Sequence, residues 1–168
     1  SYKEFLDDYK KAGGEIIQFD DCLWEQFSDE SENAQFDGKS REDKNLDLAE
    51  KYIAINNEVI DYGHSLSLKV YTHNCRGNYA SRYFTKGSYD SIANLFLKKQ
   101  NYDRFYLEWD DERAGSLDSL KALKDKDCEV VLGFLSSKTR GLDDEERALD
   151  LLEKASKIID KDRLYLSH

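Results

Sequence analysis

The sequence predicts an α/β fold built on a parallel β-sheet. Short apolar, β-branched segments alternate with segments of helical period along the whole chain, and this alternation is typical of parallel strands joined by right-handed crossovers. Acidic, thiol, imidazole and hydroxyl side chains collect where the expected strands end. Because parallel strands present their carboxyl ends at one edge, we expect these side chains to share that edge, both in a (β/α)₈ barrel and in a doubly wound sheet.

Five strands are expected, each a short run rich in β-branched and aromatic residues. The run Ile16-Ile17-Gln18-Phe19 ends in Asp20 and Asp21, and the run around Val70 ends in His73. The third run ends in Glu108, and the fourth leads into a polar exit at residues 136–139. The predicted strands cover residues 15–21, 67–73, 104–109, 129–135 and 163–167.

The helices are expected from apolar spacing and from their end signals. Gly13 ends the first helix and Gly63 is a plausible end for the second, while Ser88 or Asp90 caps the third. Acidic residues open the last helix, where they suit the helix dipole. The predicted helices cover residues 2–12, 45–62, about 92–97, 116–126 and 142–159. Residues 28–44 are polar and aperiodic, which indicates a solvated loop or a lid over a site.

Composition restricts the class of protein. The 168 residues are enough for one domain with a real core. A net charge of −10 argues against nucleic acid and anionic membranes as partners. No apolar run approaches the roughly 20 residues of a membrane span, and no signal peptide pattern is present. The three cysteines are odd in number and lack the spacing typical of a disulfide-bonded domain. Such cysteines suit a reducing compartment, so we expect a cytoplasmic protein.

Two absences indicate that the chain is part of a longer protein. The sequence has no methionine, so Ser1 is not an intact translational start, and it has no proline. Five strands also cannot close an eight-stranded barrel. If the fold is a barrel, residues 1–168 supply its C-terminal part, and two sheet edges need cover from further polypeptide or from a second copy of the chain.

A candidate metal site lies at the expected sheet edge. His73 and Cys75 are two residues apart at the end of a strand, so their side chains point the same way. Glu108 ends the neighbouring strand about 4.8 Å away, and imidazole, thiolate and carboxylate are all zinc ligands. Zinc with an open position binds a thiol and holds it as thiolate. Alternatively, His73 is a hydrogen-bonded turn residue, Cys75 a small buried hydrophobe and Glu108 a solvated acid.

The remaining thiols and imidazoles make weaker candidates. Cys22 follows two carboxylates and could lie near the site. Cys128 precedes a strand at the opposite, N-terminal edge, where we expect a structural role, and His64 lies at that edge too.

Three segments resemble the cobalamin-independent methionine synthase family, and more closely its short, single-domain bacterial members. These segments are residues 72–78 (THNCRGN), 105–115 (FYLEWDDERAG) and 131–139 (VLGFLSSKT). The resemblance implies a (β/α)₈ TIM barrel of which residues 1–168 form about five strands. It also implies a cytoplasmic, zinc-dependent S-methyltransferase of methionine biosynthesis, which transfers a methyl group from 5-methyltetrahydropteroyltriglutamate to homocysteine.

The resemblance also implies roles for single residues. His73, Cys75 and Glu108 match three of the family's four zinc ligands, and the fourth is expected in a Cys-Gly pair shortly after His168. Asp20 matches the acid that binds the homocysteine ammonium group. The chain departs from the family at Cys22, where the family has proline, and near Gln26 and Leu135, where it has a folate-contacting Glu and a proton-donating His. Alternatives are therefore a different methyl donor or thiol acceptor, or a non-catalytic barrel relative.

Overall fold

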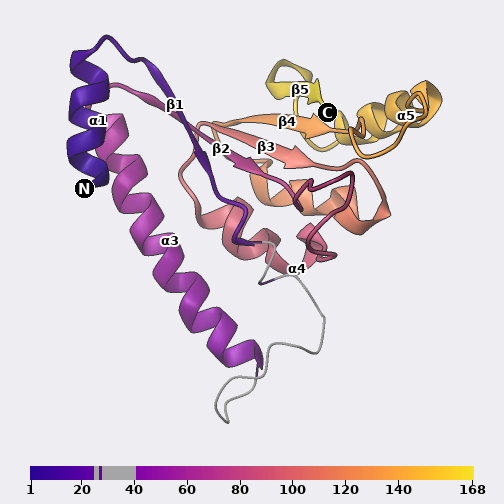
Figure 1. Ribbon diagram of the computed structural model, residues 1–168, viewed down its shortest axis with the longest axis horizontal. Helices are drawn as coiled ribbons and strands as arrows, with labels where there is room; N and C mark the ends of the chain where they lie inside the picture. The colour runs from indigo at the N-terminus through magenta and orange to yellow at the C-terminus, as the bar shows by residue number, and fades with distance from the viewer. Residues whose placement is uncertain (25–26, 28–40) are drawn as a thin grey trace.

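The computed structural model describes residues 1–24, 27 and 41–168, and its centre is a five-stranded parallel sheet (Figure 1). The strands lie side by side in sequential order, β1-β2-β3-β4-β5, and each neighbouring pair is parallel. This order confirms the predicted α/β class and the arrangement of successive strands of a TIM barrel. The strands are β1 (Ile16–Asp20), β2 (Lys69–Asn74), β3 (Arg104–Glu108), β4 (Glu129–Gly133) and β5 (Leu164–Ser167).

The helices connect the strands as the alternating pattern predicts. In Figure 1, α1 and α3 lie at the β1 end of the sheet and α5 lies at the β5 end. Ser88 caps α4 by accepting a hydrogen bond from the backbone N–H of Asp90 at 3.0 Å, as one of the two predicted alternatives requires. The helices are α1 (Tyr2–Lys11), α3 (Arg41–Ser65), α4 (Tyr89–Ile92), a π-helix (Ala93–Leu97), 3₁₀-helices at Glu112–Ala114, Leu117–Leu123 and Lys161–Arg163, and α5 (Glu145–Ala155).

Several predicted boundaries differ from the structure. Helix α3 begins at Arg41, inside the segment predicted as a loop, while residues 28–40 and the proposed lid lie outside the described residues. The same helix continues past Gly63 to Ser65. A Cβ at Gly63 would lie 2.8 Å from a methyl group of Val70, so this glycine serves helix–strand packing rather than termination. Helix α5 is shorter than predicted, because Asp144 rather than Leu142 marks its start.

The two faces of the sheet differ in chemistry. Side chains at alternate positions are fully buried beneath the helices, among them Val70, Phe105 and Leu132. The other face carries partly exposed side chains, including His73 and Glu108. The helix-covered face therefore holds the core, and the opposite face is available to a site. Nowhere in the described ranges is there a helix with the length and apolar character needed to cross a membrane.

Candidate metal centre

The C-terminal edge of the sheet brings the predicted site residues together. Parallel pairing sets Asp20 of β1 level with His73 of β2, and His73 level with Tyr106 of β3. Continuing that register by two residues sets Cys75 beside Glu108. The predicted period of two and the predicted strand order are therefore sufficient to collect these residues at one edge.

Asp20 fixes the imidazole ring of His73. Its Oδ1 atom lies 3.0 Å from Nδ1 of His73. Because a carboxylate only accepts, the ring donates from Nδ1, and Nε2 is the ring nitrogen that faces other partners. The Asp20 side chain is 77% exposed, so its carboxylate is also accessible to a ligand.

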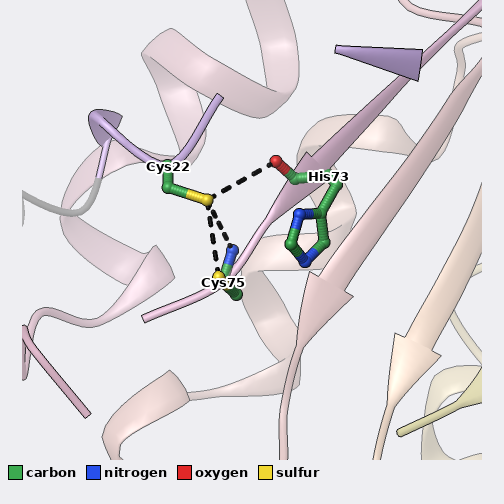
Figure 2. Close-up of side chains that lie close together, drawn as sticks. All are labelled: Cys22, His73 and Cys75. Atoms are coloured by element: carbon green, nitrogen blue, oxygen red, sulfur yellow. Dashed lines mark hydrogen bonds between the residues drawn. The ribbon is translucent and has the colours of Figure 1, made fainter. Parts of the chain in front are cut away.

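Cys22 joins His73 and Cys75 to form a compact cluster. One ligand atom from each of the three residues lies within 4.8 Å of the other two. The two sulfur atoms are 3.4 Å apart, and Cys22 Sγ lies 3.5 Å from the backbone nitrogen of Cys75. Figure 2 shows the side chains converging from the turn after β1 and from the end of β2. Two sulfurs and one imidazole are a donor set that suits zinc.

The same contacts redistribute protons within the cluster. A hydrogen bond from Cys22 and the nearby ring of His73 lower the pKa of the Cys75 thiol to about 4. The Cys75 contact, together with Asp20, raises the pKa of His73 to about 9. The pKa of Cys22 is raised, first by its hydrogen bond to Cys75 and then by burial. These shifts favour a Cys75 thiolate beside a protonated His73 ring, with the proton of the thiol pair on Cys22.

Glu108 lies at the same edge, but its carboxylate has protein partners. Oε2 accepts a hydrogen bond from the backbone N–H of Arg76 at 2.9 Å, and Oε1 lies 3.1 Å from Nζ of Lys138. Arg113 is 3.8 Å away from Oε1. Only 10% of the Glu108 side chain is exposed, so it is not the solvated acid considered as an alternative. Among the described residues, the three-residue cluster does not include it.

A cavity of about 230 Å³ links these groups. His73, Cys75 and Glu108 all line it, together with Lys138 and Leu135. Leu135 occupies the position at which the resemblance places a proton-donating histidine, and a leucine cannot donate a proton. The three predicted metal ligands therefore share one cavity, whose wall includes an apolar side chain at that position.

The other predicted roles can be compared with the structure. His64 contacts Asp103 at 2.9 Å at the N-terminal edge, and Cys128 is buried there, so both lie away from the cavity as expected. Gln26 lies outside the described residues. Sequence reasoning gave Cys22 too little weight and did not single out Lys138. Each of these two residues follows the end of a strand that points to the same edge, which predicts its edge but not the approach of Cys22 to Cys75.

Comparisons with known proteins find similar sequences in Bacillus subtilis (strain 168). It is 32% identical to the uncharacterized protein YxjH and 30% identical to the uncharacterized protein YxjG, both of Bacillus subtilis (strain 168). Each alignment covers 99% of this chain, but 44% of YxjH and 43% of YxjG. The chain thus spans less than half the length of these relatives. No protein-family model matches the sequence.

A solved structure has the same fold over nearly the whole chain. This is a B12-independent methionine synthase from Shewanella sp. W3-18-1, in complex with selenomethionine. The superposition has a TM-score of 0.68 at 22% sequence identity and covers 99% of this chain and 44% of the synthase. The likeness shows that the chain adopts part of that enzyme's fold, in agreement with the five sequential parallel strands.

Proposed function

We propose that the protein is a zinc-dependent methyltransferase that transfers a methyl group to a thiol, with homocysteine as acceptor and methionine as product. The observation that carries this proposal is the thiol–imidazole–thiol cluster at the C-terminal edge of the sheet, next to a small cavity. The fold shared with a methionine synthase supports it. That synthase was solved with selenomethionine, an analogue of the proposed product.

The residues present fit a zinc ion. His73, Cys75 and Glu108 would hold it, as the resemblance of these residues to zinc ligands implies. Zinc supplies the chemistry of lowering the pKa of a substrate thiol, so that the sulfur is nucleophilic at neutral pH. The protein's own contribution is to fix the donors: Asp20 orients the His73 ring, and the Arg76 backbone N–H and Lys138 hold the Glu108 carboxylate.

The substrate amino acid is expected to bind beside this cluster. A homocysteine ammonium group needs a carboxylate partner, and the exposed Asp20 ends β1, level with His73 on the adjacent strand. The cavity, about 230 Å³ in volume, is smaller than the roughly 300 Å³ at which typical drug-sized sites begin. A small amino acid matches that volume. The methyl donor is proposed to be 5-methyltetrahydropteroyltriglutamate.

The part of a larger barrel that residues 1–168 form is also a proposal. We infer that residues 1–168 form the C-terminal part of a catalytic barrel, because five sequential strands leave a barrel open and the relatives are more than twice as long. The missing half or a second copy would cover the open edges. We also propose a cytoplasmic location, because three cysteines without the spacing of a disulfide-stabilised domain suit a reducing compartment.

The experiment is to supply the zinc-loaded protein with homocysteine and the folate donor and to measure methionine by mass spectrometry. Wild type is expected to form methionine and Cys75→Ser to form none, while Cys128→Ser, altered at the far edge, keeps the activity. Methionine formed only with another methyl donor would support the alternative chemistry. Zinc-loaded protein that forms no methylated thiol with any donor would overturn the enzyme assignment and favour a binding role.

A further inference from the structure

The turn after β1 places a third soft donor against the His73–Cys75 pair. Cys22 Sγ lies 3.4 Å from Cys75 Sγ and 3.9 Å from the carbonyl oxygen of His73 (Figure 2). Three donors of N and S type within 4.8 Å of one another could all reach one ion at bond lengths of roughly 2.0–2.3 Å. Glu108, by contrast, is held by Lys138 and a backbone N–H.

The position of Cys22 is fixed by its neighbours on both sides. The Asp21 backbone N–H donates to the His73 carbonyl at 2.9 Å, and Asn74 donates back to the Asp21 carbonyl at 2.8 Å. The Asp21 carboxylate accepts from the indole N–H of Trp24 at 2.9 Å and from Asn56 at 2.8 Å. Trp24 is 1% exposed. The turn is thus tied to β2, to α3 and to the core, so the Cys22 thiol is held beside Cys75.

From this geometry we infer that Cys22 is itself a ligand of the metal, giving the chain a Cys22–His73–Cys75 centre. The inference rests on the zinc site of the proposed function and adds a ligand that the His-x-Cys pattern does not contain. Two thiolates and one imidazole select a soft or borderline divalent ion such as zinc over magnesium or calcium, which prefer oxygen. The chain then supplies two thiolates to the site. Glu108 is either a fourth ligand or a residue just outside the coordination shell of the ion.

The test uses cobalt(II) in place of zinc, because thiolate–cobalt bonds give a charge-transfer absorption that grows with the number of sulfur ligands. Cys22→Ser is expected to lose one thiolate's share of this absorption. Its zinc affinity should fall by more than the roughly 10–100-fold that changes outside the coordination shell cost. Cys128→Ser is the matched control and should leave both quantities unchanged. Thermal unfolding of each variant reports whether the fold is intact.

A second measurement needs no variant. In the wild-type protein, zinc should protect Cys22 and Cys75 together from iodoacetamide, and a chelator should expose both, as followed by mass spectrometry of their peptides. A Cys22→Ser protein with unaltered cobalt absorption and zinc affinity would overturn the inference. In that case loss of metal from Cys75→Ser would leave the proposed function standing. Failure of the wild-type protein to bind either metal would overturn both.

Discussion

At the scale of single residues, two acidic groups of the site each lie beside a basic group. The Cys75 thiolate lies against the His73 ring, and the Glu108 carboxylate lies against Lys138. An incoming divalent ion would therefore replace protein cations and protons, since zinc ligands must be deprotonated to bind. Each ligand assignment can be tested by asking which partner the ion displaces.

Cys75→Ser is expected to lose most of the bound zinc. A serine hydroxyl is not ionised at neutral pH and is a poor replacement for a thiolate. Zinc content per chain, measured by inductively coupled plasma mass spectrometry after extensive dialysis, gives the result. Cys128→Ser serves as the control because Cys128 is buried at the opposite edge of the sheet. Equal zinc in wild type and Cys75→Ser would remove Cys75 from the set of ligands.

Asp20→Asn separates the contact of Asp20 with His73 from its proposed contact with the substrate. The asparagine oxygen can still accept the hydrogen bond from Nδ1 of His73, so zinc content should not change. The charge that pairs with a substrate ammonium is lost, and hydrogen bonds to charged groups contribute about 1.5–3 kcal/mol. The KM for homocysteine should therefore rise about 10–100-fold. Steady-state kinetics measure this KM. Loss of zinc from the variant instead would mean that the main role of Asp20 is to orient the His73 ring.

Lys138→Met tests whether Glu108 binds the metal. The substitution leaves the nearly buried Glu108 and Asp110 with Arg113 as their remaining cationic side chain. Removing one partner of a buried ion pair costs about 3–5 kcal/mol, and the remaining Arg113 places the expected loss near the lower value. If zinc bonds to Glu108, added zinc should restore more stability in the variant than it adds to wild type, as measured by urea unfolding. Equal stabilisation would place Glu108 outside the coordination shell.

The limits of residue-level prediction are visible around this site. His73, Cys75 and Glu108 could be collected from sequence because a period of two and sequential strands determine their edge and face. Cys22 lies beyond the end of β1, in a turn whose path depends on contacts of Asp21 with α3 and of Trp24 with the core. Such tertiary contacts carry no local signal, so its approach to Cys75 was not predictable.

At the scale of elements, an acid at the start of β3 joins the strands at the N-terminal edge. Asp103 accepts from the Val70 backbone N–H at 2.7 Å and contacts His64 at 2.9 Å and Lys69 at 3.1 Å. Burial raises the pKa of Asp103, but these three partners outweigh burial and bring it below its ordinary value. The ionised form is therefore favoured by folding, and it stabilises the start of both strands.

Asp103→Asn is expected to cost about 1–2 kcal/mol at neutral pH. The pKa of Asp103 is lower in the folded state than in the unfolded state. The stability that ionised Asp103 contributes is therefore fully present above the unfolded-state pKa of about 3.9, and it is lost as the pH falls through the folded-state pKa. The difference between wild type and variant should therefore shrink on acidification below about pH 4. Urea unfolding at neutral and acid pH measures it. A difference that stays constant over this range would mean that ionisation of Asp103 does not stabilise the fold.

The element boundaries show why local signals misplace helix ends. Gly63 was a reasonable stop by composition, yet its missing side chain makes room for Val70 and the helix continues. The segment at residues 92–97 was predicted as helix, and all of it after Ile92 is a π-helix (Ala93–Leu97) in which Phe96 and Leu97 are fully buried. In both cases packing against the sheet overrides the local preference, which a single sequence does not report.

At the scale of the whole molecule, the sheet has two strands with one partner each. Among the described residues, β1 pairs with β2 alone and β5 pairs with β4 alone. Apolar side chains are exposed at both edges, with Ile16 48% exposed on β1 and Leu166 48% exposed on β5. Unpaired backbone groups beside apolar side chains promote edge-to-edge association. Both outer strands of the sheet therefore offer an edge at which another polypeptide could pair.

A polypeptide limited to residues 1–168 is accordingly expected to self-associate. Multi-angle light scattering over a range of concentrations should give a mass above the 19.6 kDa of one chain, and added charge at an edge should lower it. Leu166→Lys is suited to this, because a lysine on an edge strand opposes pairing with another chain. Leu149→Lys, at an exposed position of helix α5 rather than on an edge strand, is the control. A compact monomer with a single cooperative unfolding transition would contradict the proposal that this sheet is part of an open barrel.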